Sequence, residues 1–132
     1  MAWSVLQTGG QVTSIEREPA RHHQTDASLR AAGLRDLVAL YCGDATGLVA
    51  ELAGPFDCLF FDADRYSAPA QLAPPRLTPE VLLLAADNAL SHPQEIAGYL
   101  QAVHALPDFE HMVVAVGKGL SIAYRGLPGR DP

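Results

Sequence analysis

Cysteine, basic charge and long apolar runs are all scarce in this sequence of 132 residues. The two cysteines, Cys42 and Cys58, have no CxxC spacing, which argues against a zinc site or a disulfide framework, so we expect both to be small core residues. The longest apolar runs, such as VLLLAA at 81–86, are far shorter than the roughly 20 residues of a membrane-spanning helix. No basic segment precedes an apolar stretch near the N-terminus, and we therefore expect a cytoplasmic protein.

Basic residues are too few and too scattered for a polyanionic partner. The chain has 9 Lys and Arg against 15 Asp and Glu, which gives a net charge of -6. Because nucleic-acid binding requires a clustered basic surface, we expect neither a nucleic-acid partner nor a membrane partner. With 48% hydrophobic and 18% charged residues, the composition is that of one globular domain covering residues 1–132.

Short apolar runs alternate with helix-like segments along most of the chain. The expected strands are 11–16, 36–42, 56–61 and 80–86, and the expected helices are 18–33, 45–54 and 92–106. Apolar strands joined by helices indicate an α/β fold with a mostly parallel sheet that is covered on both faces. Two further strands, 112–117 and 120–125, are separated only by Lys118 and Gly119, which predicts a tight antiparallel hairpin at the C-terminus.

Acidic residues end or follow every one of the expected parallel strands. They are Glu16, Asp44, Asp62 with Asp64, and Asp87, which is followed by Asn88. Since open parallel sheets bind ligands outside the carboxyl ends of their strands, this pattern predicts a site for hydroxyls, amines or a cation.

Two interpretations of these residues remain open at this point. Asp62, Asp87 and Asn88 could converge on a hard divalent cation, because such cations prefer oxygen ligands. The structural alternative is that Asp62 and Asp64 begin a turn and that Asn88 caps the next helix. In the same way, Asp44 could simply cap the helix that begins at Ala45.

Four segments, in this order and spacing, resemble one known family. They are IEREPARHHQTDASLRAAGL, GDAT, GPFDCLFFDADRY and AADNAL, and they are similar to the class I S-adenosylmethionine-dependent O-methyltransferases of the caffeoyl-CoA and catechol type. The similarity runs from Gly9 to Arg125. It implies a Rossmann-like methyltransferase sheet, mostly parallel with a C-terminal antiparallel hairpin. The family's first strand and its glycine-rich loop are expected to be missing from this chain.

The resemblance implies a binding site for S-adenosylmethionine. By this resemblance Glu16 would bind the ribose hydroxyls of the cofactor, and Asp44 would lie beside the adenine. Ala45 and Asp62 would be further cofactor-binding residues.

The resemblance also implies a metal site and a charged catalytic residue. Asp62, Asp87 and Asn88 would bind Mg²⁺ or Ca²⁺. Arg65 stands where the family usually has a lysine, and a guanidinium cannot act as a general base, although it could stabilise a phenolate. Asp64 would line the same pocket in a role that the sequence does not assign.

The expected activity is therefore methyl transfer from S-adenosylmethionine to a small hydroxylated acceptor, in a reaction that depends on a divalent metal ion. One alternative is a catalytically inactive remnant that acts as an interaction module. Another is a nicotinamide-dependent oxidoreductase, but the chain has no G-x-G-x-x-G fingerprint. A homo-oligomer is expected, because a missing central strand would leave two strand edges unpaired.

The histidines give no functional signal in the sequence. His22 and His23 lie on an expected exposed helix and should be solvated. His104 and His111 do not have the spacing of metal ligands.

Overall fold

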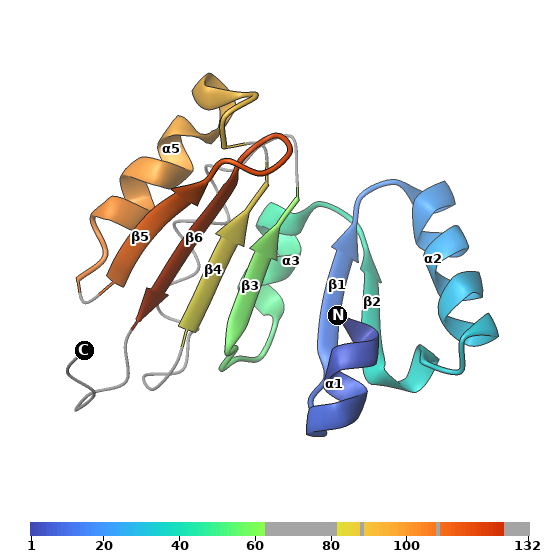
Figure 1. The fold of residues 1–132 in the computed structure, drawn as a ribbon. Coiled ribbons are helices and arrows are strands. Elements are labelled where there is room, and N and C mark those ends of the chain that lie inside the picture. The colour runs from blue at the N-terminus through green and yellow to red at the C-terminus, as the bar shows by residue number, and fades with distance from the viewer. Residues whose placement is uncertain (63–81, 88, 108, 126–132) are drawn as a thin grey trace. The chain divides into compact units, whose positions relative to one another are not determined.

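The computed structural model describes residues 1–62, 82–87, 89–107 and 109–125. The chain divides into two compact units, Met1–Leu52 and Ala53–Pro132, and each unit has its own sheet (Figure 1). The expectation of a single domain over residues 1–132 stays a prediction. No helix in these described ranges is long and apolar enough to cross a membrane.

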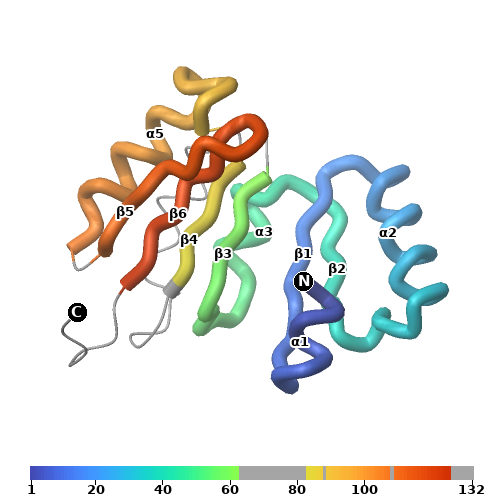
Figure 2. Tube along the Cα trace, viewed as in Figure 1, coloured from blue at the N-terminus to red at the C-terminus, as the bar shows by residue number. Residues whose placement is uncertain are grey.

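The first unit is built around one pair of parallel strands. Strand β1 (Val12–Glu16) pairs with β2 (Val38–Cys42), and the two lie side by side in Figure 2. The remaining elements of this unit are α1 (Ala2–Thr8), α2 (Pro19–Ala31), the 3-10 helix η1 (Arg35–Leu37) and α3 (Ala45–Glu51). Helix α1 ends at Gly9, whose φ of 73° is the left-handed conformation that glycine adopts without strain.

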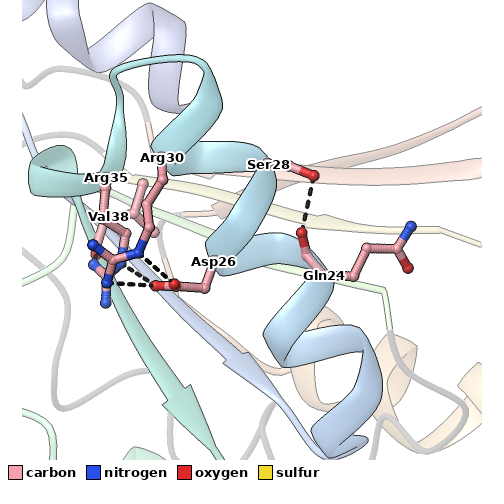
Figure 3. Close-up of polar contacts among 6 residues, drawn as sticks. All are labelled: Gln24, Asp26, Ser28, Arg30, Arg35 and Val38. Carbon is pink, nitrogen blue, oxygen red and sulfur yellow. Dashed lines mark hydrogen bonds and ion pairs between the residues drawn. The ribbon is translucent and has the colours of Figure 1, made fainter.

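A cluster of charged side chains holds the end of α2 to the start of β2. Asp26 accepts a hydrogen bond from Arg30 Nε at 2.6 Å and another from Arg35 Nε (Figure 3). Arg35 also donates to the carbonyl oxygen of Val38, the first residue of β2, whose side chain is buried. The hydrogen bonds from Arg30 and Arg35 lower the pKa of the Asp26 carboxyl below its ordinary value of 3.8. These contacts link α2 to the segment that leads into β2, within the crossover between the two parallel strands.

The second unit has a four-stranded mixed sheet in the order β3-β4-β6-β5. Strands β3 (Cys58–Phe61) and β4 (Leu82–Ala86) are parallel, whereas β6 (Leu120–Arg125) is antiparallel to both β4 and β5 (Phe109–Val114). The α/β class and the C-terminal antiparallel hairpin are thus confirmed. In the part of the chain that is described, β1 pairs only with β2 and β3 pairs only with β4, which agrees with the prediction of a missing strand.

Helix α5 (Pro93–His104) packs on one face of this second sheet. Its residues Ile96, Tyr99 and Val103 are buried against the sheet, as their helical spacing in the sequence indicates. The strands contribute Leu84, Ala86 and Ala123 to the same core.

Two details differ from the sequence-based expectations. Strand β5 ends at Val114, so the hairpin connection covers residues 115–119 and the expectation of a two-residue connection is wrong. Gly119 donates its N–H to the carbonyl of Val116 and has a φ of 89°, which closes this longer turn.

The two cysteines are exposed, so their expected place in the core is wrong. Along β3 the half-buried residues are Leu59 and Phe61, which pack against the core under α5. Because side chains alternate along a strand, Cys58 lies on the opposite face of the sheet.

Candidate functional site

Asp62 and Asp87 occupy matching positions at the carboxyl ends of two neighbouring parallel strands. Phe61 of β3 and Ala86 of β4 are partners in the strand register, and each aspartate is the next residue along the chain. The N–H of Asp87 donates to the carbonyl oxygen of Phe61 at 3.1 Å, which continues the ladder by one step. Since paired strands lie about 4.8 Å apart, both carboxylates are within reach of one small ligand. Asp62 is exposed and Asp87 is half-buried.

The backbone after Asp87 is anchored to the loop before β6. Ala89 donates its N–H to the carbonyl of Gly119, and Leu90 donates to the carbonyl of Lys118, both at 2.9 Å. A Cβ atom on Gly119 would lie 2.7 Å from the backbone nitrogen of Leu90, so only glycine permits this approach. Asp87 is therefore held between a buried strand end and a hydrogen-bonded turn, which restricts where its carboxylate can lie.

Several expected site residues lie outside the described residues. They are Asp64, Arg65 and Asn88. The expected third metal ligand and the expected catalytic residue consequently stay predictions. Among residues 1–62, 82–87, 89–107 and 109–125, no group of three or more His, Cys, Asp or Glu side chains is arranged to hold a metal ion.

Glu16 and Asp44 lie at the carboxyl edge of the first unit's parallel strand pair. Glu16 is the last residue of β1 and is in register with Cys42, the last residue of β2. Its carbonyl accepts a hydrogen bond from the N–H of Gly43 at 3.0 Å, so the chain turns toward Asp44 beside it. The half-buried Glu16 side chain accepts a hydrogen bond at Oε1 from the N–H of Glu18 at 2.8 Å. That contact holds the carboxylate near the start of α2.

Asp44 has the structural role that the sequence left open. Its Oδ1 accepts a hydrogen bond from the N–H of Thr46 at 2.8 Å, which caps the start of α3. This backbone hydrogen bond is the main reason why the pKa of the Asp44 carboxyl is lowered. Ala45 follows as the first residue of α3 and is half-buried. A carboxylate has two oxygens with several acceptor positions, so the cap leaves Asp44 able to accept further hydrogen bonds.

The chemistry available in each unit follows from these pairs. Carboxylates at a strand edge accept hydrogen bonds from hydroxyls and amines, and they bind hard cations. Glu16 and Asp44 are suited to a ligand rich in such donors, while Asp62 and Asp87 are suited to a cation or a polar ligand.

Two histidines of the second unit are in contact, which no pattern in the sequence indicates. His104 Nε2 lies 2.8 Å from His111 Nδ1, although the two residues are seven positions apart along the chain. The end of a helix and a strand bring these residues together, and no short sequence motif encodes that geometry.

Comparison with known proteins identifies the fold. No family model matches the sequence, and no curated protein matches it. Solved structures do match. An O-methyltransferase from Bacillus cereus in complex with SAH is similar at 22% identity and a TM-score of 0.78, over 89% of this chain and 63% of that protein.

Two further solved structures are similar to the same extent. A methyltransferase from Geobacter sulfurreducens has 27% identity and a TM-score of 0.74, over 88% of this chain and 58% of that protein. A Staphylococcus aureus protein described as a caffeoyl-CoA O-methyltransferase has 20% identity and a TM-score of 0.74, over 88% of this chain and 65% of that protein. The chain thus spans less than two thirds of the length of each of these three proteins.

Proposed function

We propose that this chain, which has the fold of the class I O-methyltransferases, performs methyl transfer from S-adenosylmethionine to a small hydroxylated acceptor. The observation that carries the proposal is the pairing of Asp62 with Asp87 at the ends of neighbouring parallel strands. An acidic pair of this kind lies where open parallel sheets bind their ligands.

The reaction sets clear demands on the site. The acceptor oxygen attacks the methyl carbon as the carbon–sulfur bond breaks; the bonding electrons stay on the sulfur of S-adenosylhomocysteine, and the hydroxyl proton passes to water. The three reacting atoms must therefore be aligned before the step begins. Asp62 and Asp87, with Asn88 as the expected third ligand, would hold Mg²⁺ or Ca²⁺. Such a cation, when bound, lowers the pKa of the acceptor hydroxyl and fixes its position. Arg65 would stabilise the negative charge on the acceptor oxygen.

The proposed cofactor contacts lie in the first unit. Glu16 would accept hydrogen bonds from the ribose hydroxyls, while Asp44 and Ala45 would lie beside the adenine. The common position of Glu16 and Asp44 at one strand edge supports this assignment, and so does the SAH bound to the similar Bacillus cereus protein.

A metal titration tests the central pair. Mg²⁺ or Ca²⁺ should raise the melting temperature of the protein by mass action, because the folded state alone has the two carboxylates together. The isosteric double substitution Asp62→Asn with Asp87→Asn should abolish this rise. Asp57→Asn is the matched control, since Asp57 precedes β3 at its opposite end. An unchanged metal response in the double variant would contradict the assignment.

Methyl transfer itself can be followed with labelled S-adenosylmethionine and a panel of small catechols. We expect activity in the presence of Mg²⁺ or Ca²⁺ and its loss in the Asp62→Asn, Asp87→Asn variant. Activity that is equal in the double variant and in Asp57→Asn would exclude a catalytic role for this pair.

The assembly state and location of the protein are also proposals. We expect a cytoplasmic homo-oligomer without nucleic-acid or membrane partners. Self-association is supported by β1 and β3, each of which has one edge without a strand partner among the described residues. Light scattering should give the mass of at least two chains, and the mass of one chain would refute the expectation.

A further inference from the structure

His104 and His111 form a polar contact at β5, which is the outer strand of the second unit's sheet. His104 is the last residue of α5 and is exposed, whereas His111 lies half-buried on β5. Their ring nitrogens Nε2 and Nδ1 are 2.8 Å apart. On its other side, His111 Nε2 lies 2.9 Å from the hydroxyl oxygen of Ser121, a fully buried residue of β6.

The buried serine orients the ring of His111. When His111 Nε2 donates its proton to Ser121 Oγ, the opposite nitrogen Nδ1 presents its lone pair to His104. Metal-binding histidines typically have such an arrangement, in which a second group holds the ring nitrogen that is not bound to the metal. Ser121 is in a fixed strand position, so the direction of the His111 lone pair is set by the fold.

The relative position of the two rings differs from that of a simple linear hydrogen bond. With the ring centre about 1.1 Å behind each nitrogen, a linear contact at this separation would place the two centres about 5 Å apart. The observed distance between the ring centroids is 4.5 Å, with an angle of 63° between the planes. At least one of the two ring nitrogens is therefore directed away from the line that joins them.

The separations of the two rings can be compared with those of two histidines bound to one metal ion. Metal–nitrogen bonds of about 2.05 Å that meet at 90° place the nitrogens about 2.9 Å apart and the ring centres about 4.5 Å apart. A tetrahedral angle would require about 3.3 Å and about 5.1 Å instead. The observed 2.8 Å and 4.5 Å are nearer to the values of the right-angled arrangement.

We propose that His104 and His111 form a binding site for Cu²⁺ or Ni²⁺. Imidazole nitrogens suit both ions, and right-angled coordination is typical of them, whereas Zn²⁺ prefers a tetrahedral arrangement. His104 must give up its proton on Nε2 when the ion binds. No third His, Cys, Asp or Glu joins the pair among the residues that the structure describes, so water would complete the coordination. The site is chemically distinct from the oxygen site proposed at Asp62 and Asp87.

Calorimetry and electron paramagnetic resonance test the site directly. Untagged full chain is titrated with Ni²⁺ or Cu²⁺ in excess Mg²⁺, which occupies any oxygen-ligand site. We expect one equivalent to bind and the Cu²⁺ spectrum to show coupling to two nitrogens. His104→Gln should weaken binding at least 10-fold, and Ser121→Ala should weaken it about 10- to 100-fold because the His111 ring loses its orienting partner.

His22 and His23 provide the matched control. They are also neighbouring histidines, but their ring centroids are 5.9 Å apart. The His22→Gln, His23→Gln variant should bind the ion as the unchanged protein does. His104 is exposed, so its substitution should leave the fold intact, which circular dichroism can verify. Equal binding in folded His104→Gln, a loss of binding in the control, or a Cu²⁺ spectrum without two nitrogens would each overturn the proposal.

Discussion

The core beneath α5 permits a graded prediction about the stability of the second unit. Ile96 is fully buried against the sheet, and its neighbours in this core include Leu84 and Ala123. Ile96→Val removes one methyl group and should lower the free energy of unfolding by about 0.5–1.5 kcal/mol. Ile96→Ala removes three carbons and leaves a cavity, so a loss of about 2–5 kcal/mol is expected.

The expected loss is large relative to the total stability of the unit. Domains of this size have a total stability of only about 5–15 kcal/mol, so the alanine variant should lose a substantial fraction of it. For a domain of 60–100 residues, each 1 kcal/mol corresponds to a decrease of about 4–8 °C in melting temperature. The alanine variant should consequently melt at least about 8 °C lower.

Urea unfolding followed by circular dichroism measures this series. Leu90→Ala is the control, because Leu90 is 56% exposed and its loss should change stability by no more than about 0.5 kcal/mol. Amide exchange should become faster in β4 and β6, which form the sheet beneath the helix. A loss below about 1 kcal/mol for Ile96→Ala, or an equal loss in Leu90→Ala, would refute the packing described for α5.

Three further predictions concern other parts of the chain. The folded pKa of Asp26 is below its ordinary 3.8, so the stability it contributes is present above pH 3.8 and lost as the pH falls through the folded value. When the pH is lowered through 3.8, the melting temperature of Asp26→Asn should therefore fall less than that of the unchanged protein. An equal fall in the two proteins would contradict this. Glu16→Gln should weaken SAH binding about 10- to 100-fold by calorimetry, whereas Glu18→Gln, which keeps the backbone contact to Glu16, should not. Gly119→Ala should destabilise the protein in thermal melts more than Gly33→Ala, because both have positive φ but only Gly119 would bring a Cβ against backbone.

Much of the fold could be predicted from local patterns in the sequence. The alternation of apolar runs with helical segments indicated the α/β class, and the spacing of Ile96, Tyr99 and Val103 indicated the buried face of α5. The length of the hairpin connection could not be predicted, because Ala115 and Val116 are compatible with a strand and only cross-strand register ends β5 at Val114. The exposure of the two cysteines could not be predicted either, because it depends on which face of each sheet is covered by a helix.

The candidate sites differ in how far they could be predicted, and register explains the difference. Parallel strands have their carboxyl ends at the same edge, so two acidic residues that directly follow neighbouring parallel strands are expected to be close. Asp62 and Asp87 meet this condition, and the hydrogen bond from the Asp87 N–H to Phe61 is its structural consequence. No such rule applies to His104 and His111, because their contact depends on where a helix ends next to an antiparallel strand. A site whose residues directly follow neighbouring parallel strands can therefore be inferred from the sequence. A site formed where a helix packs on a sheet requires the structure.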